Sequence, residues 1–218
     1  MDIKILYDNS AADGFESGWG FSALINDHIL FDTGENESSL MANMKSFGIS
    51  PEQIDKIVIS HSDWDHIGGI GILRHCGPVN VYLPSGASGV LKEKLARYNQ
   101  HAIVFDRGIR TALDANTHVT QTMVNRKREI SLTVTTPKGI VLITGCAHPG
   151  LENILECVGE NGPVYAVIGG FHGFTKIEAL RDVELIIPCH CTKHTEAICV
   201  RYPTRTHTGY AGAEFVIE

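Results

Sequence analysis

The stretch His61-Ser62-Asp63-Trp64-Asp65-His66-Ile67-Gly68-Gly69 places four side chains that can bind a metal within six residues. It follows the apolar run Ile57-Val58-Ile59, which predicts a buried strand. The two glycines then allow the chain to turn into its next element. Imidazole and carboxylate groups at the end of a buried strand are typical of the mouth of a metal site. The remaining ligands have to come from other parts of the chain.

Length and charge limit the classes of protein to consider. The chain has 218 residues, enough for one α/β core, and we expect a single domain over residues 1–218. Its formal net charge of −7 argues against sequence-independent nucleic-acid binding, which needs a basic surface. The basic run Arg126-Lys127-Arg128 is interpreted as a solvated turn or hairpin, with local anion binding as the alternative.

The sequence also bears on the compartment. No apolar stretch is long enough to span a membrane, so no membrane partner is expected. The first residues lack the basic start and apolar block of a signal peptide. We therefore expect a cytoplasmic protein whose six cysteines are reduced.

Short apolar runs alternate with stretches of helical spacing. We expect strands at 3–7, 20–25, 28–31, 57–60, 79–83, 119–124, 130–135, 140–144, 164–168, 185–187 and 214–217. Helices are expected at 37–47, 89–98, 151–158, 177–181 and 195–200. These strands are too many for one helix-covered sheet. The expected fold class is therefore α/β (α+β), with two packed sheets and helices outside them.

Four other expected strands also end in residues that can bind a metal. They run into Asp32-Thr33-Gly34, Gly145-Cys146-Ala147-His148, Gly170-Phe171-His172 and Cys189-His190-Cys191. Loops at strand ends are where α/β scaffolds place their sites. Two neighbouring cations at such an edge can share a hydroxide. A mixed imidazole and carboxylate set suits zinc, iron or manganese rather than calcium, so we expect one or two divalent metal ions.

Simpler interpretations apply to some residues near these motifs. Asp32 could serve only as the Asp of an Asp-Thr-Gly turn. Alternation along a strand predicts that Cys189 and Cys191 face away from His190 and, like Cys146, are small buried thiols. Packing is the expected role of Trp64.

Taken in order, the motifs FDTG (31–34), HSDWDHIGG (61–69), GCAHPG (145–150) and PCHC (188–191) resemble those of the metallo-β-lactamase fold superfamily. The nearest branch contains proteins similar to dihydropterin-ribofuranosylaminobenzene-phosphate synthase, to judge from 6–9, 18–22 and 169–172. The resemblance covers most of the chain except about 86–135. It implies a four-layer αβ/βα sandwich of two mixed β-sheets, with helices on the outer faces and the site at one edge of the sheets.

The resemblance also implies roles for individual residues. The first metal would be bound by His61 and His148, and the second by Asp65, His66 and His190. Asp32 would orient the cluster through hydrogen bonds. On this basis zinc is the first expectation for the metal.

The chain departs from the family pattern at two positions. Asp63 stands where the family has histidine. Its harder oxygen donor shifts the expected metal ion of the first site toward iron or manganese. The aspartate that bridges the two metals in the superfamily has no counterpart, and His172 is expected as its replacement among the metal ligands. Because histidine cannot bridge as a carboxylate does, the number of filled metal positions stays open.

These features predict a metal-dependent hydrolase, in which a metal-bound hydroxide attacks an ester or phosphoester of a small-molecule substrate. Asp65 is the expected catalytic residue and would move the proton. Three alternatives stay open: a non-haem iron redox or gas-handling protein, a pterin-related protein like the nearest branch, and a non-catalytic metal-binding protein. Pairing through exposed strands or helices is common for such sandwiches, so a homodimer is also considered.

Overall fold

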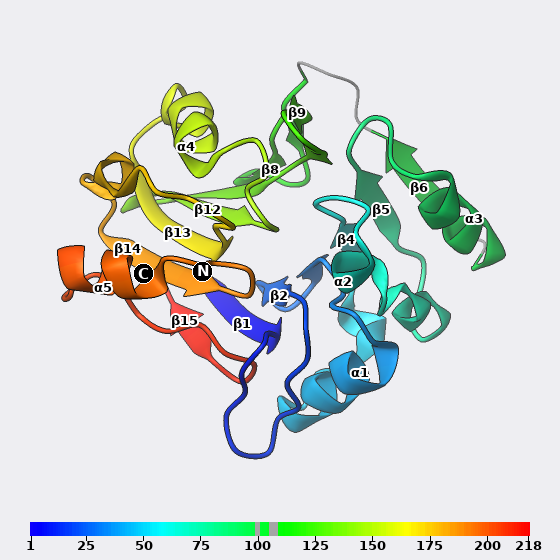
Figure 1. The fold of residues 1–218 in the computed structure, drawn as a ribbon. Helices are drawn as coiled ribbons and strands as arrows, with labels where there is room; N and C mark the ends of the chain where they lie inside the picture. Colours follow the sequence, from blue (N-terminus) through cyan, green and yellow to red (C-terminus); the bar gives the residue numbers. More distant parts are fainter. Residues whose placement is uncertain (99–100, 105–108) are drawn as a thin grey trace.

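Two β-sheets face each other in the centre of the molecule, and helices cover the outer face of each (Figure 1). The computed structural model describes residues 1–98, 101–104 and 109–218. Within this part of the chain the first sheet has the order β15-β1-β2-β3-β4-β5-β6. Its strands are β1 Asp2–Tyr7, β2 Ser22–Ile25, β3 Ile29–Phe31, β4 Lys56–Val58, β5 Asn80–Leu83, β6 His101–Val104 and β15 Glu214–Val216.

The second sheet has the order β14-β13-β12-β11-β8-β7. Its strands are β7 Thr111–Ala112, β8 Thr117–Val119, β11 Leu132–Thr136, β12 Gly139–Thr144, β13 Val164–Gly170 and β14 Leu185–Cys189. A separate hairpin consists of β9 Met123–Val124 and β10 Arg128–Glu129. The α-helices are α1 Glu37–Ser46, α2 Trp64–Ile67, α3 Gly89–Arg97, α4 Leu151–Gly159 and α5 Thr195–Arg201, and the 3₁₀ turns are η1 Pro51–Gln53, η2 Ile70–Arg74 and η3 Ile177–Leu180.

Alternation along the strands builds the layers. In β12, Val141 and Ile143 belong to the apolar core between the two sheets. Leu142, on the other face, packs in a second core with Ile154 of α4. In β3, Leu30 likewise faces a third core beneath α1. Since successive side chains of a strand point to opposite faces, strands buried on both sides produce helix, sheet, sheet and helix layers. The predicted α/β fold with two sheets between helices is confirmed.

Helix α1 begins and ends where the sequence indicates. The side chain of Asn36 accepts a hydrogen bond from the backbone N–H of Ser39, which caps the first turn. Gly48 has a φ of 71°, in the left-handed region that glycine adopts without strain. Its N–H donates to the carbonyl of Lys45, which closes the last turn.

One predicted strand and one predicted helix are wrong in detail. The stretch 119–124 is not one strand, because β8 ends at Val119 and the chain then leaves the sheet as the β9–β10 hairpin. It returns as β11, and Leu132 pairs with Val119. Thr120 and Ser131 close the base of this excursion, since each backbone N–H bonds to an oxygen of the other residue. The stretch 177–181 is the short 3₁₀ turn η3 rather than an α-helix.

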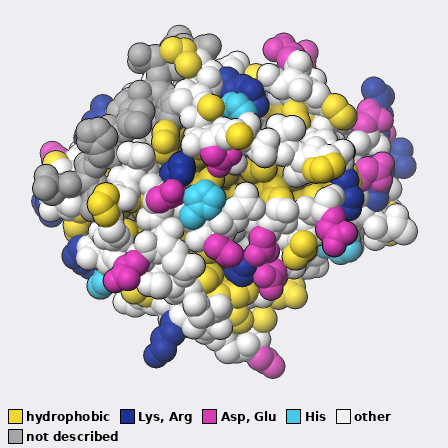
Figure 2. All heavy atoms as spheres, turned by 180° about the vertical axis from the view of Figure 1, so that it is seen from behind, with side chains coloured by type: hydrophobic (Ala, Val, Ile, Leu, Met, Phe, Trp, Pro, Cys, Tyr) yellow, Lys and Arg dark blue, Asp and Glu magenta, His cyan; other side chains and the backbone are white. Residues whose placement is uncertain are grey.

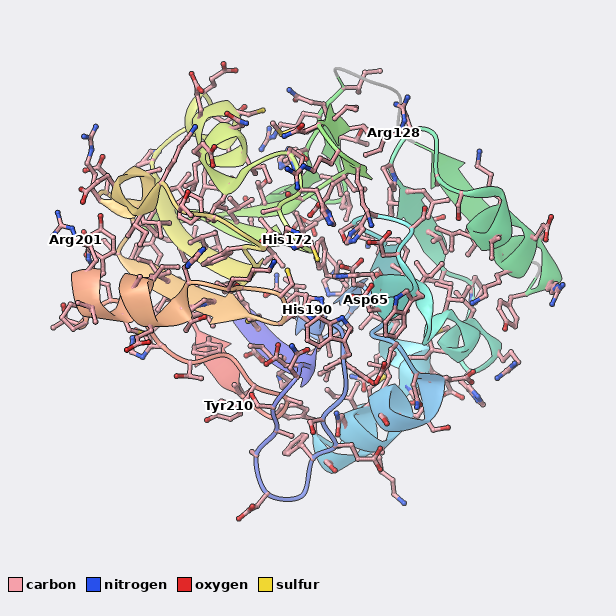
Figure 3. The ribbon with its side chains drawn as sticks, viewed as in Figure 1. Asp65, Arg128, His172, His190, Arg201 and Tyr210 are labelled. Atoms are coloured by element: carbon pink, nitrogen blue, oxygen red, sulfur yellow. The ribbon has the colours of Figure 1, made fainter. Side chains whose placement is uncertain are left out.

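The parallel strands bring the candidate site together. β3, β4 and β5 run parallel in one sheet, and β12, β13 and β14 run parallel in the other. The polar segments that follow β3, β4, β12, β13 and β14 meet at one edge of the sandwich, where Figure 3 labels Asp65, His172 and His190. The opposite face, seen in Figure 2, shows acidic, basic and hydrophobic side chains intermixed. None of the described helices has the length and apolar character to cross a membrane.

Candidate metal centre

Four histidines at this edge are each held through the Nδ1 atom, which leaves Nε2 for another partner. The Nδ1 contacts are His61 with Ser60 Oγ at 2.8 Å, His66 with Asp32 Oδ2 at 2.7 Å, His148 with Glu129 Oε2 at 2.8 Å and His190 with Asn9 Oδ1 at 2.9 Å. With an acceptor opposite Nδ1, the proton sits on Nδ1 and Nε2 keeps its lone pair. Metal-binding histidines are oriented in this way by their outer partners.

The imidazole rings follow one another along the edge. Ring centroids lie 5.1 Å apart for His190 and His66, 4.2 Å for His66 and His61, and 4.7 Å for His61 and His148. His172 continues the row, 5.1 Å from His148. The structure therefore brings together five histidines that come from four separate loops.

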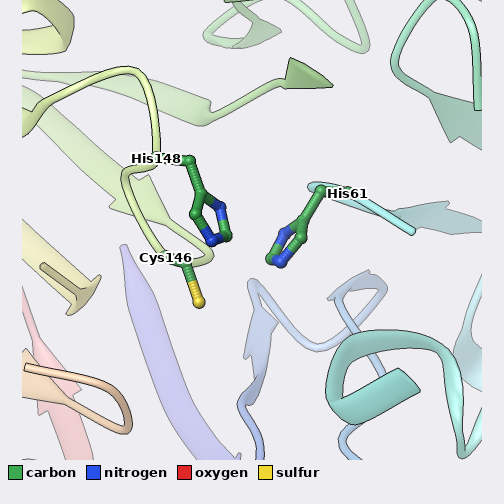
Figure 4. Close-up of side chains that lie close together, drawn as sticks. All are labelled: His61, Cys146 and His148. Carbon is green, nitrogen blue, oxygen red and sulfur yellow. The ribbon is translucent and has the colours of Figure 1, made fainter. Parts of the chain in front are cut away.

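Cys146 stands between two of the predicted ligand pairs. In the described part of the chain, two groups of three side chains have ligand atoms within 4.8 Å of one another: His61, Cys146 and His148, and His66, Cys146 and His190. Figure 4 shows the first group, with the Cys146 thiol beside the two imidazoles. The Sγ atom lies 3.2 Å from His66 Nε2. The interpretation of Cys146 as only a buried thiol missed this central position.

Cys191 also turns toward the centre, which contradicts the sequence-based prediction. Its Sγ atom is 3.2 Å from that of Cys146. Alternation fails here because β14 ends at Cys189 and His190 has a φ of 47°, outside the extended region. All six cysteines of the chain are free thiols.

The two carboxylates of the opening stretch lie beside the histidines. Asp65 Oδ2 is 3.3 Å from His190 Nε2, and Asp63 Oδ2 is 3.5 Å from His61 Nε2. Asp63 also forms an ion pair with Lys127 of the β9–β10 hairpin. Burial acts to raise the pKa of Asp65, but its contact with His190 and its proximity to His66 hold it at about 2. Asp65 is therefore ionised at neutral pH.

Asp32 lies beneath the histidines and is fully buried. Its carboxylate accepts hydrogen bonds from the backbone N–H of Ser60 at 2.7 Å and from the Ser60 hydroxyl at 2.6 Å. Because that hydroxyl donates to Asp32, it accepts from His61, so one carboxylate orients both His61 and His66. Burial raises the pKa of Asp32 to about 7. A side chain at Gly145 would displace this network, since its Cβ would lie 2.1 Å from Ser60 Oγ.

Sequence reasoning missed Glu129, at the end of the hairpin. Its buried carboxylate accepts from the backbone N–H groups of Cys146, Ala147 and His148, each at 2.9 Å. Burial acts to raise the pKa of Glu129, but these bonds and the contact with His148 hold it at about 2. The sequence signal was a single acidic residue directly before the apolar run 130–134, in the part of the chain without a family resemblance.

The donor set fits a divalent transition metal. The Nε2 atoms of His61 and His190 are buried and have no hydrogen-bond partner among the described residues. Such orphaned polar atoms are rare unless an ion or water satisfies them. Burial lowers the pKa of His61, and burial together with the charge of His190 lowers that of His66 to about 4. Neutral imidazoles with a thiol suit zinc or iron.

His172 lies outside both groups of three. It stands beside His148, and its Nδ1 atom is buried without a partner in the described part of the chain.

The backbone at Asp32, Ala147, His172 and His190 has φ between 45° and 54°. Such left-handed conformations in residues other than glycine cost about 1–3 kcal/mol each and gather at functional sites.

Two exposed tryptophans adjoin residues of the candidate metal centre. Trp19 is 50% exposed and its ring lies 5.1 Å from that of His190. Trp64 is 60% exposed on α2, so the prediction that it packs into the core is wrong. The short α2 turns its buried face, with Asp65 and His66, toward the site and leaves Trp64 outside.

Comparisons with known proteins agree with this fold. A 7,8-dihydropterin-6-methyl-4-(beta-D-ribofuranosyl)-aminobenzene-5'-phosphate synthase of Methanocaldococcus jannaschii is 27% identical, over 77% of this chain and 76% of that protein. The uncharacterized protein MJ0448 of the same organism is 29% identical, over 87% of this chain and 90% of that one.

A solved structure is also similar over the whole length. Tm1679, described as a metal-dependent hydrolase of the beta-lactamase superfamily, superposes with a TM-score of 0.84 and 28% identity, covering 100% of this chain and 99% of that one. The model of the metallo-beta-lactamase superfamily matches residues 20–190, which include the strand ends that carry both groups of three. The chain therefore belongs to the metallo-beta-lactamase superfamily.

Proposed function

We propose that this protein is a metal-dependent hydrolase that acts on an ester or phosphoester of a small molecule. The observation that carries the proposal is the convergence of four Nε2 atoms, each on a ring fixed through Nδ1, around the thiol of Cys146. Two of these atoms, Nε2 of His61 and Nε2 of His190, are buried without a hydrogen-bond partner among the described residues, and convergent donors of this kind are suited to a metal. The similar structure of a metal-dependent hydrolase supports the same class of reaction.

Two adjacent positions would hold the metal. His61, His148 and Cys146 would hold one ion, and His66, His190 and Cys146 the other, with the carboxylates of Asp63 and Asp65 at their outer sides. A divalent ion bound there would supply Lewis acidity, which polarises the ester and acidifies water. The sequence has no counterpart of the bridging aspartate. Cys146, which belongs to both groups of three, would take its central position.

Asp65 is the residue we assign to proton transfer. Its carboxylate is ionised, largely buried and 3.3 Å from His190 Nε2. An ionised carboxylate at the edge of the centre can accept a proton from the attacking water and release it to the leaving group. Contacts with His61 and with Lys127 lower the pKa of Asp63, so this second carboxylate is ionised as well.

The synthase-like relative favours a second candidate. The name of this relative describes the synthesis of a pterin-related compound carrying a phosphate, and it is 27% identical to this chain. In that case the same centre would serve transfer of a group to a second organic substrate rather than to water. The hydrolase needs only water as its second reactant, whereas the synthase-like enzyme needs a second organic substrate.

Metal analysis and turnover test the proposal together. The protein would be purified without added metal, its metal content measured, and its activity assayed on a panel of phosphoesters and carboxylic esters. We expect at least one transition metal per chain and hydrolysis that falls at least about 100-fold in Asp65→Asn. Glu184→Gln, at an exposed carboxylate far from the centre, is the matched control. Metal-loaded protein that hydrolyses none of the panel, but turns over when a second organic substrate is added, would favour the synthase-like function.

A further inference from the structure

A cavity of about 320 Å³ opens beside the histidine row, at its His172 end. It is lined by four segments that are far apart in sequence: the β9–β10 hairpin with Arg126, the turn at His148, the start of α4 and the loop with His172 and Lys176. His148 belongs both to this wall and to the first group of three. A ligand in the cavity would therefore lie next to the metal centre without occupying it.

The cavity is positively charged although the chain carries a net charge of −7. Arg126 is exposed, and its guanidinium has no carboxylate partner within the described residues. Lys176 is paired with Glu152 at 3.0 Å, which is the acidic residue of the lining. The backbone N–H of Lys193 donates to the carbonyl of His172 at 2.9 Å, which brings a further lysine to the same loop.

The hairpin links this charge to the metal centre. Its tip presents Arg126 to the cavity, while Lys127 pairs with Asp63 on the other side. At its end, Glu129 holds the backbone of residues 146–148. Arg126 is thus an unpaired cation on an element anchored at two points. Its side chain is exposed, whereas the backbone that carries it is fixed.

We propose that this cavity binds a phosphate group of the substrate that is separate from the bond being broken, with Arg126 as the main determinant. The inference rests on the proposed function for the role of that substrate, but the binding site itself stands on the cavity and its charge. A guanidinium can form two parallel hydrogen bonds with a phosphate, and a cleft of one sign concentrates oppositely charged ligands. The row of imidazoles then sets the direction of the substrate, from the phosphate at the His172 end toward the metal centre.

Titration of the protein with inorganic phosphate and with pyrophosphate, followed by calorimetry, tests the binding site. The proteins are the wild type, Arg126→Ala, Arg126→Lys and the control Arg201→Ala, whose residue lies on α5 away from the centre (Figure 3). We expect Arg126→Ala to weaken binding at least about tenfold, Arg126→Lys to retain part of it, and the control to match the wild type. Because Arg126 is exposed, the fold is expected to be intact, which thermal melting verifies.

Two further results separate the site from the metal centre. The same titration after removal of metal by a chelator should retain the binding that depends on Arg126. Equal affinities of wild type and Arg126→Ala, or complete loss of binding on chelation, would overturn the proposal. Phosphate binding that depends on Arg126 without any hydrolysis would leave this inference standing and reject the hydrolase. Hydrolysis with a KM that does not change in Arg126→Ala would support the hydrolase and reject the phosphate site.

Discussion

Glu129 Oε2 accepts two hydrogen bonds from His148, one from its backbone N–H at 2.9 Å and one from its Nδ1 atom at 2.8 Å. The position of the residue and the rotation of its ring are therefore set by the same oxygen. The other oxygen of Glu129 holds the two residues before it. One buried carboxylate thus shapes the whole loop that contributes Cys146 and His148 to the candidate metal centre.

Glu129→Gln should weaken metal binding. The variant keeps the size of the side chain but replaces one acceptor oxygen with an amide N–H, which would oppose a donor in the loop. Loss of an outer partner of a metal-binding histidine typically costs 10–100-fold in affinity, and we expect a loss in this range. Competition for zinc against a chromophoric chelator measures it, with the exposed Glu160→Gln as control. Equal zinc affinity in the two variants would contradict the role assigned to Glu129.

Cys146→Ser should affect both metal positions at once. The thiol is the one side chain shared by the two groups of three, and a hydroxyl is a poor substitute for a thiolate on zinc or iron. We expect the affinity for each bound ion to fall by at least about tenfold, with a lower metal content after purification. Cys199→Ser, on α5, is the matched control and should keep the content of the wild type. A normal metal content in Cys146→Ser would remove the thiol from the ligand set.

Asp63→His should shift the choice of metal. The substitution replaces a hard oxygen donor 3.5 Å from His61 Nε2 with an imidazole and frees Lys127 from its ion pair. We expect the ratio of zinc to iron bound during expression to rise. An imidazole nitrogen in place of the carboxylate oxygen makes the donor set softer, which favours zinc. Elemental analysis measures the ratio, and Asp182→His, at an exposed position, is the control. Identical metal content in the two variants would show that Asp63 does not select the ion.

Asp8 predicts a specific pH dependence of stability. Burial raises its pKa from 3.8 to about 6, despite a hydrogen bond from the backbone N–H of His190. Between these two pKa values the folded state binds more protons than the unfolded state. The free energy of unfolding therefore falls as pH rises through this range.

Asp8→Asn keeps the acceptor for His190 but cannot ionise. It should be more stable than the wild type above pH 6, by about 3 kcal/mol, and lose this advantage below pH 4. Urea unfolding of both proteins at a series of pH values measures the difference. An advantage that is the same at every pH would mean that the ionisation of Asp8 is not its cause.

The sequence predicted most where local pattern and function coincide. His61, His66, His148 and His190 could be found because each lies in a segment that follows an apolar run, and parallel strands bring such segments to one edge. The layers of the sandwich follow from apolar side chains on both faces of β3 and β12.

What the sequence could not predict depends on contacts between distant segments. Glu129 and Arg126 gain their surroundings only because the β9–β10 hairpin folds over the loop after β12, and no local signal encodes that approach. Cys191 was misplaced because strand alternation was extended past Cys189, where a left-handed residue at His190 redirects the chain. Trp64 was misplaced because the short helix α2 buries Asp65 and His66 and leaves Trp64 exposed.

The contact between Trp19 and His190 gives the centre an optical reporter. The chain has two tryptophans, one against a candidate ligand ring and the other in the helix with Asp65 and His66. Indole fluorescence therefore originates entirely at this edge of the molecule. Quenching by a paramagnetic ion would follow its arrival at the His190 end in real time, and Trp19→Phe would separate that signal from the emission of Trp64.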